Sequence, residues 1–333
     1  MTTLVTGATG LVGNNVIRVL LAQQRPVRVL LRPDSDQRPF EGLDVERVEG
    51  DITDAASVHR AVKGADGAIH CAGLVHIGWS FQELHDHVNL GGVVHVGDAC
   101  LAEKIPMVHV STINALGIGA WDKPATETTA LPGITQCPYV ISKRSADHRI
   151  VDLAAKGLTS TIVYPGFMLG PWDWKPSSGK MLLEVASRWT PFAPIGGFSI
   201  CDVRNVAAAI LKAYDRMSDP TTRETGKPSH YIMAGENLTY LDAWRLFAKV
   251  ADGRAPVGRC GPLMRIVAGR FGDLLGKCTG KEPNVNSAAI QMSSLPHYFS
   301  SDLATRELDY CAGNVELAAT AAWDWFQEHG YVK

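Results

Sequence analysis

Residues 6–13 read Thr-Gly-Ala-Thr-Gly-Leu-Val-Gly, between an apolar run at 3–6 and apolar residues at helical spacing over 11–21. Gly7 permits a tight turn out of a strand, Gly10 lets a pyrophosphate approach the backbone, and Gly13 lets helix and strand pack closely. Free N–H groups at the start of the helix favour that anion. The alternative is a glycine-rich turn without a ligand. The residues expected to bind a dinucleotide here are Gly7, Thr9, Gly10, Leu11, Val12 and Gly13.

Strand and helix patterns alternate through the first half of the chain. Such alternation predicts an α/β fold of the Rossmann type, a doubly wound parallel sheet covered by helices on both faces. The strands are predicted at 3–6, 27–31, 45–48, 67–70, 107–110, 160–163 and 230–233, and the main helices at 11–21, 88–103, 140–155, 202–214 and 315–328.

The pattern changes after residue 164. Residues 165–200 are rich in Pro, Gly and Trp without a clear period, and residues 236–333 are mostly helical in pattern. We therefore expect a dinucleotide-binding domain of residues 1–165 and 201–235. A smaller, mostly helical substrate-binding lobe is expected from residues 166–200 and 236–333.

Composition excludes several classes of protein. The 333 residues are 46% hydrophobic and 20% charged, which excludes a disordered chain. The 32 basic and 34 acidic residues give a net charge of −2 and form no basic stripe, so nucleic acid is not an expected partner. No apolar run reaches the roughly 20 residues that span a bilayer, so no membrane partner is expected. No signal peptide is recognisable, and the seven cysteines show no close pairing, as in reduced thiols of a cytoplasmic protein packed mostly in the core.

Arg32 follows the second predicted strand, where an acidic residue would favour NAD. Its planar guanidinium suits bidentate contact with the 2′-phosphate of NADP(H). A solvated surface arginine is the alternative. Asp34 and Asp36 lie just beyond and could reach a ribose hydroxyl instead. The sequence favours NADP(H) and leaves NAD(H) open.

Tyr139 and Lys143 lie four residues apart at the start of a predicted helix and so share one face. A phenol with a pKa of about 10 is a poor acid or base at neutral pH, and a neighbouring ammonium lowers that pKa. Alone, this spacing is common on wet helix faces. Downstream of a dinucleotide turn, it indicates an acid/base pair.

Ser111 and Thr112 end the fifth predicted strand. Strand ends face the ligand crevice in open α/β sheets, where a hydroxyl can stabilise charge developing on a substrate oxygen. The alternative is that both hydroxyls only satisfy backbone groups at the strand end.

These motifs occur in the order of the extended short-chain dehydrogenase/reductases. The chain most resembles the dihydroflavonol-4-reductase-like branch of the NAD-dependent epimerase/dehydratase family, which includes hopanoid-associated sugar epimerases. The resemblance covers essentially the whole chain. Further matching segments are Gly50-Asp51-Ile52, His70-Cys71-Ala72-Gly73, Val88-Asn89-Leu90, Tyr164-Pro165-Gly166, Cys201 to Ala207 and Tyr231 to Asn237.

The resemblance implies roles for particular residues. Tyr139 would be the acid/base, and Lys143 would lower its pKa and hold the nicotinamide ribose. Thr112 would take the place of the family's catalytic serine, and Asn89 would steady the catalytic network. Relatives often form homodimers. The remaining residues implied to contact the cofactor are Arg32, Asp51, Ile52, Cys71, Ala72, Gly73, Ser111 and Pro165.

Two departures concern the pocket wall. Cys71-Ala72-Gly73 replaces a more usual Ala-Ala pair, and Tyr164 stands where the family usually has arginine. His85, Asp86 and His87 lack the spacing of metal ligands, so no metal is expected. Five aromatic residues fall in segments expected near the substrate. Individually they suit core packing, but together they favour an apolar or aromatic substrate; they are Trp79, Phe81, Trp172, Trp174 and Phe192.

The expected activity is NAD(P)H-dependent reduction of a ketone or aldehyde on a small, apolar or aromatic molecule, with a Thr112–Tyr139–Lys143 set. An NAD-dependent sugar epimerase or dehydratase is the alternative enzyme. A dinucleotide-sensing protein without turnover is the alternative outside enzymes, and the intact Tyr139/Lys143 pair argues against it.

Overall fold

A seven-stranded parallel sheet organises the computed structural model, which describes residues 1–130, 135–219, 221 and 225–332. The strand order is β10-β6-β5-β4-β1-β2-β3, with the reversal between β1 and β4 that is typical of a doubly wound fold. The strands are β1 (Thr3–Thr6), β2 (Val27–Leu31), β3 (Glu46–Glu49), β4 (Gly67–His70), β5 (Met107–Val110), β6 (Ser160–Pro165) and β10 (Ser229–Met233).

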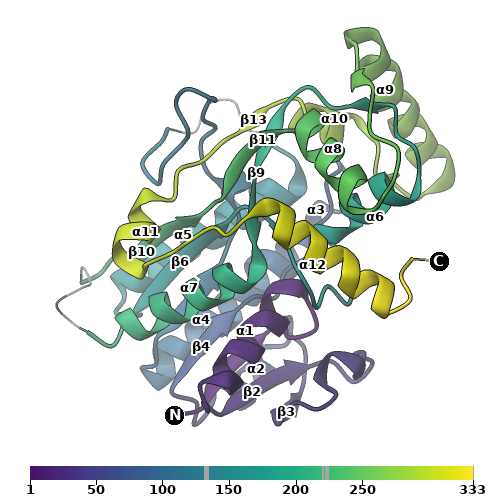
Figure 1. Cartoon of the computed structure of the whole chain (residues 1–333). Coiled ribbons are helices and arrows are strands. Elements are labelled where there is room, and N and C mark those ends of the chain that lie inside the picture. The colour runs from purple at the N-terminus through teal and green to yellow at the C-terminus, as the bar shows by residue number, and fades with distance from the viewer. Residues whose placement is uncertain (131–134, 220, 222–224, 333) are drawn as a thin grey trace.

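Helices cover both faces of this sheet (Figure 1). On one face α1 packs against α7, and on the other α4 packs against α2 and α5. The central strands β1, β4, β5 and β6 are buried along their whole length, which explains their near-continuous apolar sequences. The helices are α1 (Leu11–Ala22), α2 (Ala55–Val62), α3 (Gln82–His85), the π-helix η2 (Asp86–Leu90), α4 (Gly91–Glu103), α5 (Pro138–Ala155) and α7 (Val203–Arg216), with short 3₁₀ turns η1 (Arg38–Phe40) and η3 (Ile113–Ala115).

A second region is built around the short strand β9, which pairs with β11, β13 and β7. Its core contains Trp325 and Phe326 of α12 and Phe247 of α8. The strands are β7 (Phe167–Leu169), β8 (Phe192–Ala193), β9 (Gly197–Asp202), β11 (Glu236–Thr239), β12 (Gly258–Arg259) and β13 (Pro296–His297). The helices are α6 (Gly179–Ser187), α8 (Tyr240–Val250), α9 (Pro262–Thr279), α10 (Ser287–Met292), α11 (Asp302–Leu308) and α12 (Val315–Glu328).

The Rossmann-type fold expected from the sequence is confirmed, and each predicted strand is present. α2 and β9 were not expected. α11, although inside the range expected for the second lobe, packs against α7 and β10 of the large sheet. All seven cysteines are free thiols. Cys100, Cys137 and Cys201 are buried in the core and Cys71 packs against it, so four of the seven pack in or against the core, as expected.

Candidate active site

The glycine turn between β1 and α1 requires glycine at two positions. Gly7 has φ +69°, and a Cβ there would lie 2.5 Å from the backbone nitrogen of Ala72. A Cβ on Gly13 would lie 2.4 Å from the carbonyl oxygen of Gly7. Both distances are too short for carbon, so these residues let the turn, α1 and the segment after β4 pack together.

Gly10 has a different environment, which fits a pyrophosphate. A Cβ there would meet only the Gly7 carbonyl oxygen, at 3.4 Å. Gly10 caps α1 without a side-chain acceptor, and the first turn carries no acidic residue. The N–H groups of Leu11 and Val12 therefore begin a helix whose positive end suits an anion.

The other residues implied to contact the cofactor follow the carboxyl ends of neighbouring strands. Because all these strands are parallel, the segments after them meet at one edge of the sheet. Arg32 follows β2; its side chain is 56% exposed, with Nε 3.7 Å from Oδ1 of Asp34. Asp51 follows β3, and its Oδ1 accepts hydrogen bonds from Thr53. Ile52, Cys71, Ala72, Gly73, Ser111 and Pro165 lie at the same edge, after β3, β4 and β5 and at the end of β6.

Tyr139 is buried in the first turn of α5, at this same edge. Burial raises the pKa of Tyr139 to about 12, and the nearby Thr112 hydroxyl partly offsets the rise. The direction is opposite to the lowering expected from Lys143, because removal from water disfavours the phenolate. At neutral pH the phenol therefore keeps its proton.

Lys143 lies one turn further along α5 and is also buried. Its Nζ donates a hydrogen bond to the carbonyl oxygen of Val110, 2.8 Å away. Burial lowers the pKa of Lys143 to about 8, while the carboxylate of Asp147 opposes that effect. Lys143 thus stays mostly charged at neutral pH but is close to losing its proton.

The side chain of Asn89 links the segment after β4 to helix α5 through hydrogen bonds. Its Oδ1 accepts a hydrogen bond from the backbone of Leu74 (2.7 Å), and its Nδ2 donates to Ser142 Oγ (2.9 Å). Asn89 lies in the π-helix η2, a widened turn that often occurs at functional sites. Asn89 therefore holds the loop containing Gly73 near Lys143.

A buried polar cluster behind Lys143 was not found from the sequence. Nε2 of His109 lies 3.4 Å from Oδ1 of Asp147, and Tyr164 and Nδ1 of His230 share a 3.0 Å hydrogen bond. Burial raises the pKa of Asp147 to about 6, and the Ser111 hydroxyl acts in the opposite direction. Ser111 and Thr112 therefore face different groups: Ser111 faces Asp147, and Thr112 faces Tyr139.

His85 also belongs to the site, although nothing in the sequence placed it beside Tyr139. It is fully buried, and its ring centroid lies 6.1 Å from that of Tyr139. Beside it, Nε2 of His76 lies 3.0 Å from Oε2 of Glu282. Among the described residues, no group of three His, Cys, Asp or Glu side chains could hold a metal ion.

The five aromatic residues expected near the substrate occupy three places. Trp79 and Phe81 are 46% and 49% exposed, on the segment that joins β4 to α3. Trp172 and Trp174 instead pack against Trp325 of α12, and Phe192 lies in the short strand β8. Only Trp79 and Phe81 therefore lie in the segment that approaches His85.

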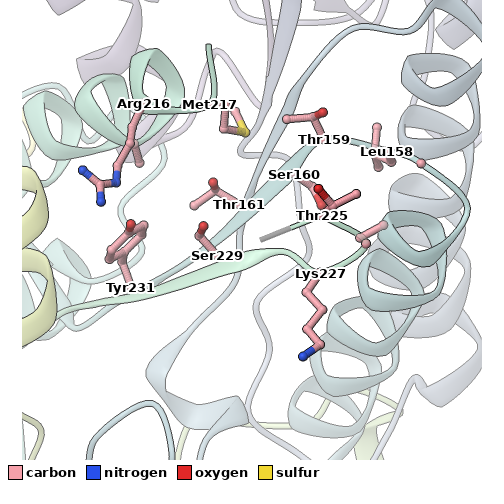
Figure 2. A pocket seen from close by; sticks show the side chains of 14 residues that line it. Leu158, Thr159, Ser160, Thr161, Arg216, Met217, Thr225, Lys227, Ser229 and Tyr231 are labelled. Carbon is pink, nitrogen blue, oxygen red and sulfur yellow. The ribbon is translucent and has the colours of Figure 1, made fainter. Parts of the chain in front are cut away.

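A cavity of about 150 Å³ lies at the opposite edge of the sheet (Figure 2). Thr161 and Ser229 line it at the amino ends of β6 and β10, with Arg216 of α7 nearby. Tyr139 and the glycine turn lie at the carboxyl ends of the strands, so this cavity is separate from them.

The glycine turn and the Tyr139/Lys143 pair share one edge of a parallel sheet, and sequence comparison agrees with this arrangement. The sequence model of the NAD dependent epimerase/dehydratase family matches residues 3–224. The chain belongs to this family. It is therefore an oxidoreductase of the extended short-chain dehydrogenase/reductase type, and its family binds an NAD(P) dinucleotide.

Relatives match along the whole chain. Sterol demethylase protein B of Methylococcus capsulatus is 30% identical, with all of both chains covered. A putative dihydroflavonol 4-reductase of Synechocystis is 29% identical over 99% of this chain and 95% of the relative. The crystal structure of gox2253 superposes with a TM-score of 0.84 at 32% identity, covering 100% and 99% of the two chains.

Proposed function

We propose that the protein reduces a carbonyl group on an apolar molecule, with NADPH as the preferred hydride donor. The observation that carries this proposal is the buried, protonated Tyr139 beside Thr112. Because burial raises the pKa of Tyr139 to about 12, the phenol is protonated at neutral pH and holds the proton that reduction of a carbonyl requires.

Different residues would bind the cofactor, donate the proton and stabilise the developing charge. The segments around Gly10, Arg32, Asp51 and Gly73 would hold the dinucleotide, which supplies a hydride for the carbonyl carbon when bound. Tyr139 donates its phenolic proton to the carbonyl oxygen. Thr112 donates a hydrogen bond to the same oxygen as negative charge develops there.

Lys143 and Asn89 have supporting roles in this proposal. The Lys143 ammonium, held by the Val110 carbonyl, stabilises the phenolate that remains after proton transfer. Asn89 fixes the loop after β4 against α5, so that Gly73 and Lys143 keep their relative positions.

Three observations support an apolar substrate and NADPH. Trp79 and Phe81 expose aromatic surface on the segment leading to His85, and one full-length relative is named for sterol demethylation. Arg32 presents an exposed guanidinium at the end of β2, where the 2′-phosphate of NADPH would lie.

The experiment is a spectrophotometric assay of NADPH and NADH oxidation with a panel of cyclic and isoprenoid ketones. Any nucleotide carried through purification is first released and identified. We expect nearly nucleotide-free protein that oxidises NADPH with at least one ketone. Tightly retained NAD with no response to NADPH would instead identify an epimerase, because an epimerase regenerates its cofactor in place.

A further inference from the structure

Helix α9 is attached to the protein through its smallest residues. A Cβ on Gly272 would lie 1.9 Å from the carbonyl oxygen of Val285, and one on Gly269 would lie 3.2 Å from Cα of Ser287. Asp273 reinforces the contact, because its Oδ1 accepts a hydrogen bond from the backbone of Ser287 (2.9 Å). Close backbone packing along this face directs the large side chains of α9 outward.

The outward face of α9 is apolar. Leu263, Val267, Phe271 and Leu274 are 73%, 58%, 64% and 59% exposed. At 100° per residue, these side chains fall within one arc of the helix, opposite the glycines. Figure 1 shows α9 at the outer edge of the molecule, beyond α8 and α10. Met264, Leu275 and Cys278 extend the same exposed face.

Basic residues flank this apolar face along one side. Residues 254–281 contain six basic residues and one acidic residue, a net charge of +5 in a chain whose total is −2. Arg270 and Lys277 lie on α9 immediately beside the apolar arc and are exposed. Within the part of the chain that the structure describes, neither has an ion-pair partner. The one acidic residue, Asp273, is already engaged by Ser287.

We propose that α9 docks the protein onto an anionic lipid bilayer, with its apolar arc among the acyl chains and its basic residues at the headgroups. A helix with an exposed apolar face and a basic flank is the form that binds in the plane of a membrane interface. Anionic headgroups carry the opposite charge to Arg270 and Lys277 and would attract them. Two such surfaces from identical chains would both be positively charged and repel, which disfavours a second copy as the occupant.

Membrane docking is a property additional to the proposed reaction, and it differs from the expectation of no membrane partner. That expectation rested on the lack of a spanning segment, and no helix among the described residues is long and apolar enough to cross a membrane. An interfacial helix needs no such length.

The docking helix is linked to the candidate active site. The segment that receives α9 includes Glu282, whose carboxylate accepts hydrogen bonds from the backbones of Trp79 and Ser80. Ser287 Oγ likewise accepts a 2.7 Å hydrogen bond from Trp79 Nε1. Docking through α9 would therefore bring the bilayer toward the loop that leads to His85 and Tyr139, a suitable place to take up an apolar substrate.

Sedimentation with vesicles tests the proposal. The full-length protein is mixed with vesicles of phosphatidylcholine alone or with phosphatidylglycerol added. We expect stronger binding to the anionic vesicles and weaker binding as salt is raised. Arg270→Gln/Lys277→Gln should reduce binding to anionic vesicles roughly 25-fold, at about fivefold per basic residue. Phe271→Ser/Leu274→Ser should reduce it more than 100-fold.

Matched substitutions elsewhere serve as controls. Leu317→Ser removes an equally exposed side chain from α12, and Lys63→Gln/Lys156→Gln removes two exposed lysines from the large domain. Both controls should bind vesicles like the wild type, and circular dichroism should show that all variants are folded. The proposal would be overturned if the wild-type protein did not bind anionic vesicles, or if the α9 variants bound them as strongly as the controls do. The wild type could instead be a dimer that does not bind vesicles, with Phe271→Ser/Leu274→Ser monomeric. That result would show that the apolar face of α9 mediates self-association.

Discussion

Gly10 and Gly13 differ in what a methyl group would meet, and substituting each by alanine separates the cofactor role of the turn from its structural role. At Gly10, φ is −88° and ψ is 167°, an extended conformation that alanine adopts without strain. The new Cβ would meet only the Gly7 carbonyl oxygen, at 3.4 Å. Gly10→Ala should therefore leave the free energy of unfolding within about 1 kcal/mol of the wild type.

The same methyl group should obstruct the dinucleotide. A backbone N–H bonded to a charged phosphate contributes about 1.5–3 kcal/mol, so losing one such contact should weaken NADPH binding roughly 10- to 150-fold. Gly13→Ala places its Cβ 2.4 Å from the Gly7 carbonyl oxygen. That overlap should cost about 1–3 kcal/mol and lower the Tm by roughly 1–4 °C.

Calorimetric titration with NADPH and thermal unfolding of the cofactor-free proteins measure the two effects. Gly10→Ala should lose affinity for NADPH at a nearly unchanged Tm, and Gly13→Ala should have a lower Tm. Normal NADPH affinity in Gly10→Ala would show that the pyrophosphate does not lie on this turn. A Tm loss in Gly10→Ala as large as in Gly13→Ala would contradict the contact geometry.

Four further predictions concern the reaction. Tyr139→Phe should keep NADPH affinity in titration but lower kcat by roughly 10²–10⁴-fold, since only the proton donor is lost; near-normal kcat would remove Tyr139 from the mechanism. Thr112→Ala should lower kcat roughly 10²-fold or more, while Thr112→Ser should keep most of the activity. Equal rates in the wild type and both variants would show that another group, with Ser111 the first to test, donates the hydrogen bond to the substrate oxygen. Arg32→Asp should reverse a roughly tenfold or greater preference for NADPH over NADH in titrations, and an unchanged ratio would contradict the 2′-phosphate contact. Asp147→Asn removes the carboxylate that raises the pKa of Lys143, so the pKa of Lys143 should fall below its value of about 8. The alkaline limb of the pH profile of kcat/KM should then move to lower pH. An unchanged alkaline limb would show that Asp147 does not influence the reaction.

Sequence patterns predicted the parts of this fold that depend on neighbouring residues. The glycine turn and the four-residue spacing of Tyr139 and Lys143 are local features, and both occupy the expected edge of the sheet. Helix α2 was missed because Ala55–Val62 has few large apolar residues. Asp54, whose carboxylate accepts hydrogen bonds from the backbones of Ala56 and Ser57, was the available signal for its start.

Burial and contacts between distant segments were beyond sequence reasoning. The direction of the Tyr139 pKa shift depends on how completely the phenol leaves water, which the tertiary packing determines. His85 reaches Tyr139, and Asp147 reaches His109, only after the chain has folded. Their residue types alone gave no reason to group them.

The strand order also has a consequence during protein synthesis. β6 is buried along its whole length, and its outer neighbour is β10, with Thr161 paired to Ser229. About 70 residues must be translated between these partners, which takes roughly 4–14 s at about 5–20 residues per second. During that interval the nascent chain carries an apolar strand with an unsatisfied edge, the kind of surface that recruits chaperones or aggregates. Slowed translation between residues 165 and 229 should therefore lower the yield of native protein, whereas the same delay near the end of the chain, after β10 has left the ribosome, should have little effect.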